Sequence, residues 1–168
     1  MPTHALPPGF RIRPAEAEDV PALLDLIRGL AEYERLTHQM EADEAGLRAS
    51  LFGDRRYAEA VIGEFEGEPV GFALYFHSYS TFLGKPGLYL EDLFVKPEHR
   101  GRGFGGALLR HVGRVAVERD CGRLEWAVLD WNEPAIGFYR KLGAAPLDEW
   151  TTYRMTGDAL RRLAEGGP

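Results

Sequence analysis

Apolar and polar positions recur along the chain with two periods, and these periods predict its elements. Helical spacing of apolar residues predicts helices over 18–35, over 41–52 and from Phe104 onward, with a short helix between Asn132 and Gly143 and a terminal helix to about 164. Extended apolar or alternating runs predict strands. The expected strands are 10–13, 58–65, 69–79, 88–95, 123–129 and 148–155.

The order of these elements predicts an α/β (α+β) fold with a mixed, mostly antiparallel sheet flanked by helices. Three strands from 58 to 95 follow one another across short turns, so they are expected to be antiparallel, with 10–13 as an edge strand. The helix from Phe104 then crosses over to 123–129, which predicts a parallel pair. At 168 residues the chain suits one domain, expected over 10–165 after a flexible tail at 1–9.

The strand over 88–95 is expected to be central because both of its faces are apolar. Side chains alternate along a strand, which predicts that Leu88, Leu90 and Phe94 share one face and that Leu93 and Val95 share the other. Glu91 and Asp92 interrupt this pattern, and a carboxylate in a central strand is costly unless it is paired, hydrated or used. We assign a functional role to Glu91 and a structural role to Asp92.

A glycine-rich run, residues 100–106, lies between this strand and the next helix. A helix N-terminus presents unpaired N–H groups, and glycine lets a phosphate approach the backbone, so the run predicts a phosphate site. Gly101, Gly103 and Gly106 satisfy the dinucleotide pattern G-x-G-x-x-G, for which Glu125 would be the ribose-binding acid. That match is weak, because four residues separate the strand from the glycines and Glu125 begins its own strand.

A second pattern in the same run is R-x-x-G-x-G, formed by Arg100, Gly103 and Gly105 after L-F-V and V-x-P. It resembles the acetyl-CoA site of the GNAT N-acetyltransferase superfamily. N-x-x-A-x-x-F-Y from Asn132, followed by L-G-A, resembles the second GNAT signature. The segments Y-L-E-D-L-F-V, W-N-E-P-A-I-x-F-Y and L-A-x-Y-E are closest to the spermidine/spermine (diamine) and thialysine N-acetyltransferase group.

This resemblance implies a parallel strand pair splayed around acetyl-CoA, and it assigns residues to the cofactor and to the acceptor amine. The backbone of the glycine run would hold the pyrophosphate, and the edge of the central strand would pair with the pantetheine arm. The implied cofactor contacts are Leu93, Phe94, Val95, Arg100, Gly101, Arg102, Gly103, Phe104, Gly105, Gly106, Asn132, Glu133, Pro134, Ala135 and Tyr139. The implied acceptor contacts are Tyr33, Glu34, Glu91, Glu125, Trp126 and Ala127, with Asp148 as a further candidate.

Two of these residues are assigned to the chemistry of acetyl transfer to a primary amine. An amine with a reference pKa of about 10.4 is protonated at pH 7, and removing that proton costs about 4.6 kcal/mol. We expect Glu91 to anchor the amine and to accept its proton through water. Tyr139 could protonate the thiolate leaving group or could pack its helix onto the sheet; spacing does not separate these, and the resemblance favours catalysis. Direct transfer and a homodimer are also implied.

Composition narrows the partners and the compartment. The net charge of −6 gives no sign of a nucleic-acid surface. Cys121 is the single cysteine, which favours a reducing, cytoplasmic location, and no apolar run is long enough to span a membrane. The five histidines lack metal-ligand spacing, so no metal is expected. The alternatives are an acetyltransferase for a protein or peptide amine and a non-catalytic acyl-CoA sensor or dinucleotide-binding module.

Overall fold

The computed structural model describes residues 5–166. The chain divides into two compact units, one that ends at Ala127 and one that begins at Val128. The first unit contains the sheet and three α-helices, and the second contains two short helices. A single domain over 10–165 stays a prediction.

The first unit is built on a five-stranded sheet whose strands lie side by side in chain order. The three hairpin or edge contacts are antiparallel and the last contact, between β4 and β5, is parallel. The mixed sheet, its edge strand and its parallel pair are thus confirmed. The strands are β1 (Phe10–Pro14), β2 (Glu59–Phe65), β3 (Glu68–Ser80), β4 (Lys85–Val95) and β5 (Leu124–Glu125).

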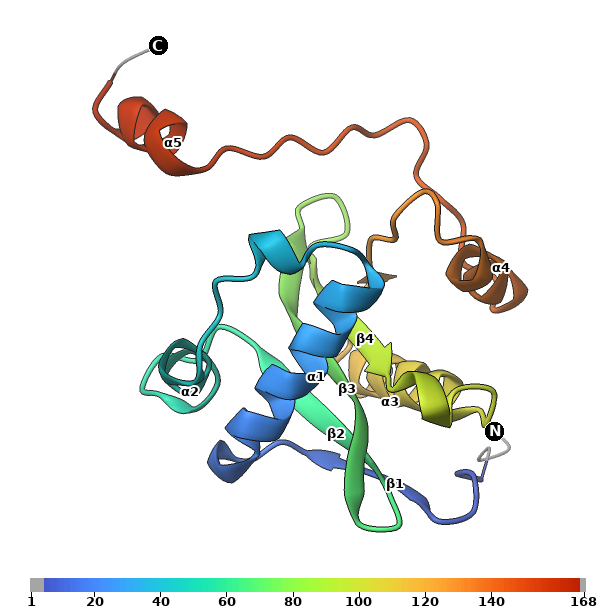
Figure 1. Cartoon of the computed structure of the whole chain (residues 1–168). Coiled ribbons are helices and arrows are strands. Elements are labelled where there is room, and N and C mark those ends of the chain that lie inside the picture. Colours follow the sequence, from blue (N-terminus) through green and yellow to red (C-terminus); the bar gives the residue numbers. More distant parts are fainter. Residues whose placement is uncertain (1–4, 167–168) are drawn as a thin grey trace. The chain divides into compact units, whose positions relative to one another are not determined.

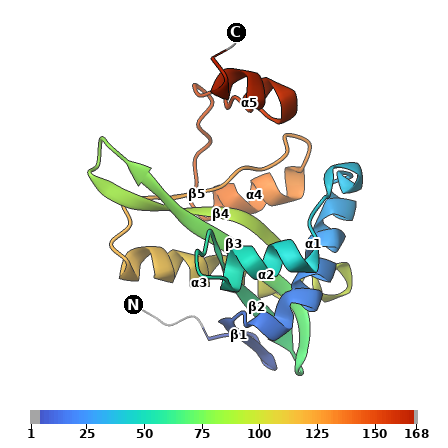
Figure 2. The ribbon, with the colours of Figure 1, turned by 90° about the vertical axis from the view of Figure 1, so that its left-hand side faces the viewer.

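Helices cover both faces of this sheet. Figures 1 and 2 show α1 (Val20–Tyr33) and α2 (Glu44–Phe52) on one face and α3 (Phe104–Glu118) on the other. The core under α1 and α2 contains Leu23 and Leu26 of α1 packed with Ile62, Phe72 and Phe94 of the sheet, all of them buried. Three short 3₁₀ turns lie between the larger elements: η1 (Ala17–Asp19), η2 (Thr37–Gln39) and η3 (Pro97–His99).

A β-bulge at Glu91 changes the direction of the side chains in β4. Leu90 lies opposite Tyr75 of β3 and Asp92 lies opposite Leu74, so Glu91 is the extra residue. Because Leu74 and Tyr75 are adjacent, they point to opposite faces, and so must Leu90 and Asp92. The expected alternation is therefore wrong beyond Leu90. Phe94, opposite Phe72, shares the α1 face with Asp92 rather than the face of Leu90.

The outer edge of β4 is open beyond its short contact with β5. β5 pairs with β4 at Leu88 and Tyr89 and spans two residues, so the predicted strand over 123–129 is mostly wrong. Lys96 N–H donates to the Val70 carbonyl at 2.9 Å, which makes the next pair, Val95 with Gly71, a non-hydrogen-bonded pair. The peptide groups of Val95, and of Leu93 two residues earlier, therefore point away from β3.

The second unit contains α4 (Glu133–Lys141) and α5 (Gly157–Ala164). The side chain of Asn132 accepts from Ala135 N–H at 3.4 Å, so the predicted N-cap and helix are confirmed. The predicted strand over 148–155 is wrong, since residues 144–156 form neither helix nor strand. A strand needs a neighbouring strand to take its hydrogen bonds, and the described part of this unit has none.

Candidate active site

The glycine run ends β4 and starts α3 through two left-handed residues. Gly101 has φ +76° and Gly103, the N-cap of α3, has φ +83°. Both lie in a region that residues with a Cβ avoid. A Cβ built at Gly101 would meet nothing within 4 Å, and one at Gly103 would meet only Pro7, at 3.8 Å. The loop therefore presents open backbone.

The first turn of α3 offers backbone donors beside this open backbone. The first intrahelical bond there runs from Ala107 N–H to the Gly103 carbonyl, at 3.0 Å. The N–H groups of Phe104, Gly105 and Gly106 precede it, and Gly103 has no side chain to cap them. A helix of fifteen residues adds the positive end of its dipole. Together with the open edge of β4, this geometry fits a pyrophosphate with an extended amide-bearing arm.

The two arginines of the loop stack on aromatic rings. The Arg102 guanidinium carbon lies 5.2 Å from the ring centroid of Phe65. That of Arg100 lies 4.5 Å from the ring centroid of Tyr33 and 5.5 Å from that of Phe94, and its Nε donates to the Val95 carbonyl at 3.0 Å. Arg100 thus contacts both the edge of β4 and the end of α1, a position that its motif did not predict.

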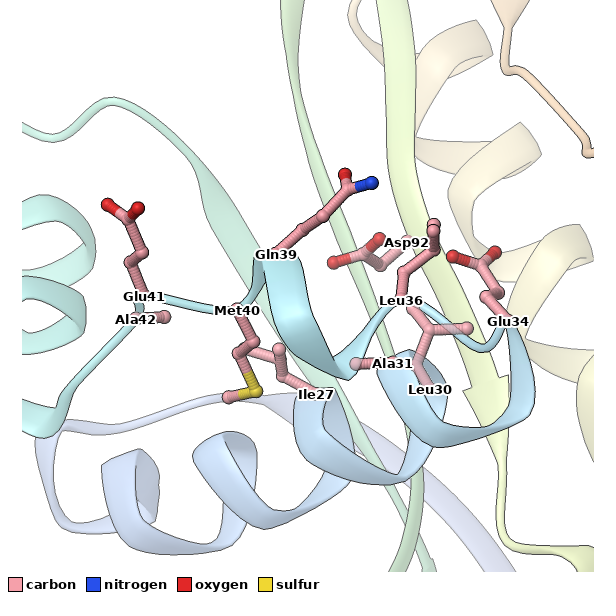
Figure 3. A pocket seen from close by; sticks show the side chains of 10 residues that line it. All are labelled: Ile27, Leu30, Ala31, Glu34, Leu36, Gln39, Met40, Glu41, Ala42 and Asp92. Atoms are coloured by element: carbon pink, nitrogen blue, oxygen red, sulfur yellow. The ribbon is translucent and has the colours of Figure 1, made fainter. Parts of the chain in front are cut away.

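A cavity of about 370 Å³ lies between the end of α1, the segment that follows it and β4. Figure 3 shows the carboxyl groups of Glu34 and Asp92 near Leu36, with Ile27 and Met40 farther along the cavity. Glu41 lies at the opposite end from this pair. The wall is thus apolar between acids at its two ends, which suits a cation on a hydrocarbon chain. The lining residues are Ile27, Leu30, Ala31, Glu34, Leu36, Gln39, Met40, Glu41, Ala42 and Asp92.

Glu34 reaches this cavity because of the way α1 ends. Leu36 N–H donates to the Ala31 carbonyl at 2.8 Å and Arg35 N–H to the Glu32 carbonyl at 3.1 Å, the pair of bonds that defines a Schellman motif. Arg35 occupies the left-handed position of this motif with φ +60°, although glycine is favoured there. Burial raises the pKa of Glu34 above its ordinary value.

Asp92, for which the sequence predicts a structural role, lines the cavity beside Glu34. Burial, then the negative charges of Glu91 and Glu34, raise the pKa of its carboxyl to about 7. No cation among the described residues neutralises it. An unneutralised carboxyl with a raised pKa that lines a cavity is a candidate for contact with a ligand. Glu91 and Asp92 are adjacent in sequence, and the bulge turns them to different sides of the strand.

The other expected acceptor residues of the first unit lie in differing environments. Glu91, at the bulge, is exposed, and Tyr33 is half-buried against Arg100. Glu125 lies at the end of β5, where Arg123 pairs with it at 3.0 Å and competes for its charge. Trp126 and Ala127 follow it without forming a strand. Gln39, Met40 and Glu41, which the motifs did not single out, line the cavity instead.

The remaining expected residues lie in the second unit. Asn132 to Ala135 form the start of α4, where Glu133 and Pro134 occupy the first turn. Tyr139 lies one turn later, with its ring centroid 5.6 Å from that of Phe138. Asp148 lies in a turn after this helix.

Within residues 5–166, no group of three or more His, Cys, Asp or Glu side chains could hold a metal ion. None of the helices in that range is long and apolar enough to cross a membrane.

A mixed sheet with a short parallel pair, a glycine-capped helix and an acid-lined cavity corresponds to the acyltransferase architecture that the motifs predict. The family model described as Acetyltransferase (GNAT) family matches residues 21–144. The integron cassette protein VCH_CASS6 of V. cholerae superposes with a TM-score of 0.79 at 26% identity, covering 94% of this chain and 98% of that one.

Curated relatives narrow the comparison. The thialysine N-epsilon-acetyltransferase of Bos taurus is 43% identical over 164 residues, covering 91% of this chain and 96% of that protein. The spermidine/spermine N(1)-acetyltransferase-like protein 1 of Homo sapiens is 33% identical over 165 residues, 92% of this chain and 24% of that protein. The chain belongs to the GNAT family, in its thialysine and polyamine group, and is an N-acetyltransferase.

Proposed function

We propose that the chain transfers acetyl from acetyl-CoA to a primary amine of a small cationic acceptor, a polyamine or a lysine- or thialysine-like compound. The observation that supports this most directly is the cavity that Glu34 and Asp92 line, next to the open edge of β4. Two carboxyl groups give an ammonium group its partners, and the apolar wall suits a methylene chain. The relatives named for thialysine and for spermidine/spermine support the same acceptor class.

The donor would bind along the open edge of β4 and the start of α3. Leu93 and Val95 would pair with the pantetheine arm, and backbone N–H groups from Gly101 to Gly106 would hold the pyrophosphate. Asn132 to Ala135 would supply further contacts. The open space at Gly101 and the uncapped first turn of α3 support this assignment.

The amine must lose a proton before it can attack. Glu91 would accept it through water, as the family resemblance implies. Asp92 is a second acceptor, because a carboxyl with a pKa of about 7 is better matched to proton transfer at neutral pH than an ordinary one. The nitrogen lone pair then forms the C–N bond at the thioester carbonyl and the C–S bond breaks. The sulfur leaves with the electron pair and receives a proton from Tyr139. The attached nitrogen then releases its remaining extra proton, which gives the neutral amide and restores the Tyr139 phenol.

A protein or peptide amine is the second candidate acceptor. The pocket that Glu34 and Asp92 line is open to solvent, so its volume does not separate the two acceptors. The relatives named for thialysine and for spermidine/spermine favour the small amine. We also propose a homodimer, as the family resemblance implies, and a cytoplasmic location. Light scattering on the purified protein tests whether it is a homodimer.

The test is the release of free coenzyme A thiol from acetyl-CoA in the presence of spermidine, spermine, putrescine, thialysine, lysine or a lysine-containing peptide. We expect turnover with a small amine, and a fall of about 100-fold or more in Tyr139→Phe with coenzyme A affinity retained. Tyr79→Phe, an exposed tyrosine at the tip of the β3–β4 hairpin, is the matched control and should keep full activity.

Turnover confined to the peptide would replace the small-amine acceptor with a protein amine. Full activity in Tyr139→Phe would remove the proposed acid. No release with any amine, despite acetyl-CoA binding, would contradict the small-amine proposal as a whole.

A further inference from the structure

We infer that Arg100 is a positioning residue that couples the cofactor edge of β4 to the acceptor cavity, an inference that rests on the proposed function. The motif alone places Arg100 at the phosphates. In the structure its side chain instead joins two elements that the reaction must keep in register, the end of β4 and the end of α1.

The first attachment is at the cofactor edge. Arg100 Nε donates to the Val95 carbonyl at 3.0 Å. That carbonyl points away from β3, toward the edge on which the pantetheine arm would pair. Arg100 therefore occupies the last acceptor of this edge and leaves Leu93 and the Val95 N–H for a ligand. Its position will respond to whatever binds there.

The second attachment is at the acceptor cavity. The Arg100 guanidinium carbon lies 4.5 Å from the ring centroid of Tyr33, the last residue of α1, and the next residue, Glu34, lines the cavity. Phe94, at 5.5 Å, contacts the guanidinium from β4 and lies two residues after Asp92, on the same face of the strand. The same cation thus touches residues close in sequence to two of the acids that line the cavity, Glu34 and Asp92.

The end of α1 has a strained conformation that a contact with Arg100 can stabilise. Its Schellman motif places Arg35 at φ +60°, a conformation that costs a residue with a Cβ free energy. A strained helix end persists only when its surroundings hold it, and Arg100 on Tyr33 is one such contact. Fixing the loop around a cofactor fixes Arg100 and, through Tyr33, Glu34.

Hydrogen–deuterium exchange tests this with coenzyme A alone and needs no acceptor. The N–H groups of Glu34, Arg35 and Leu36 are hydrogen-bonded within the end of α1 and report its opening. We expect saturating coenzyme A to slow their exchange about fivefold in the wild type and to leave it unchanged in Arg100→Met. Tyr33→Phe, which keeps the ring, should behave as the wild type, and Tyr33→Leu as Arg100→Met.

Arg102→Met is the matched control, because Arg102 stacks on Phe65 and not on α1. With coenzyme A saturating, it should keep the slowed exchange whatever its affinity. In the double variant Arg100→Met/Tyr33→Leu, the slowing of exchange by coenzyme A should be reduced no further than in either single variant. The reason is that both substitutions remove the same contact, that of Arg100 with Tyr33.

Slowed exchange that persists in Arg100→Met, with only coenzyme A affinity reduced, would make Arg100 a phosphate contact and overturn the coupling. Equal loss in Arg102→Met would also overturn it, as a general effect of the loop. Calorimetry that finds no coenzyme A binding to the wild type would overturn the proposed function, on which the coupling rests. Coenzyme A binding with the same change in exchange in wild type and Arg100→Met would overturn the coupling alone, so the two failures are distinguishable.

Discussion

Asp92 is a carboxyl that is costly to the fold and that, in the proposed function, serves the reaction. Burial and two neighbouring carboxylates raise its pKa to about 7. Between its unfolded pKa near 3.8 and this value, the folded state binds more protons than the unfolded state. The free energy of unfolding therefore falls as pH rises through this interval. A cationic acceptor would relieve that cost by pairing with the charge.

Replacing this carboxyl should make the protein more stable and its binding of a cationic amine weaker. We expect Asp92→Asn to raise the free energy of unfolding by about 1 to 3 kcal/mol at pH 8 and to change it little at pH 4, where the aspartic acid is already neutral. Its KM for a cationic amine should rise. Urea unfolding at both pH values measures the first effect, with Glu98→Gln, an exposed acid, as the control. Equal stability of Asp92→Asn and wild type at pH 8 would contradict the buried charge.

At the scale of elements, β4 and α3 illustrate how irregular backbone builds a site on regular structure. The bulge at Glu91 turns Asp92 toward α1, and the left-handed N-cap at Gly103 leaves the first turn of α3 open. Both decide where existing groups point, which is why bulges and positive φ recur beside active sites.

A pair of glycines in this region tests that reasoning. Gly103→Ala must hold a Cβ at φ +83° and should lower the free energy of unfolding by about 1 kcal/mol and weaken coenzyme A binding. Gly113→Ala lies in the middle of α3, where a Cβ meets nothing within 4 Å, and should raise it by about 0.5 to 1 kcal/mol. Thermal unfolding and calorimetry measure both. We expect the two substitutions to change the free energy of unfolding in opposite directions. A Gly103→Ala variant that is more stable than the wild type would refute the strain at this N-cap.

At the scale of the whole molecule, the first unit depends on an ion network that attaches β1 to the sheet. Glu64 is buried in β2 and pairs with Arg13 at 2.7 Å and with Arg11, while Arg13 also pairs with Asp19 at 2.6 Å. Burial alone would raise the pKa of Glu64, but the hydrogen bonds and charges of Arg13 and Arg11 outweigh it and lower that pKa. The network is thus stabilising when Glu64 is charged.

Removing the charge of Glu64 should destabilise the protein at neutral pH, whereas removing that of Asp92 should stabilise it. We expect Glu64→Gln to lower the free energy of unfolding by about 1 to 2 kcal/mol at pH 7, because two cations lose their buried partner. The folded pKa lies below the unfolded value, so this contribution is present above about pH 4.5 and is lost as pH falls further. Glu68→Gln, exposed at the β2–β3 turn, is the control. A loss that persists at pH 3 would rule out the ionic origin.

The sequence by itself determined the elements that depend on local rules. Periodicity placed the helices of the first unit and its strands β1 to β4, the crossover helix required the parallel pair, and Asn132 and the glycines marked helix starts. The motif order also identified the family, because those residues must be contiguous to build a loop or a helix turn.

Only the tertiary structure decided the features that depend on a partner distant in sequence. The bulge at Glu91 exists in the register between β3 and β4, and it alone turned Asp92 and Phe94 to the α1 face. Residues 148–155 have strand-like composition but no described neighbour to pair with in their unit. Arg100 meets Tyr33 because the end of α1 packs beside the loop after β4. Backbone pairing and ring contacts join residues far apart in the chain, and local pattern carries no information on which residues will meet.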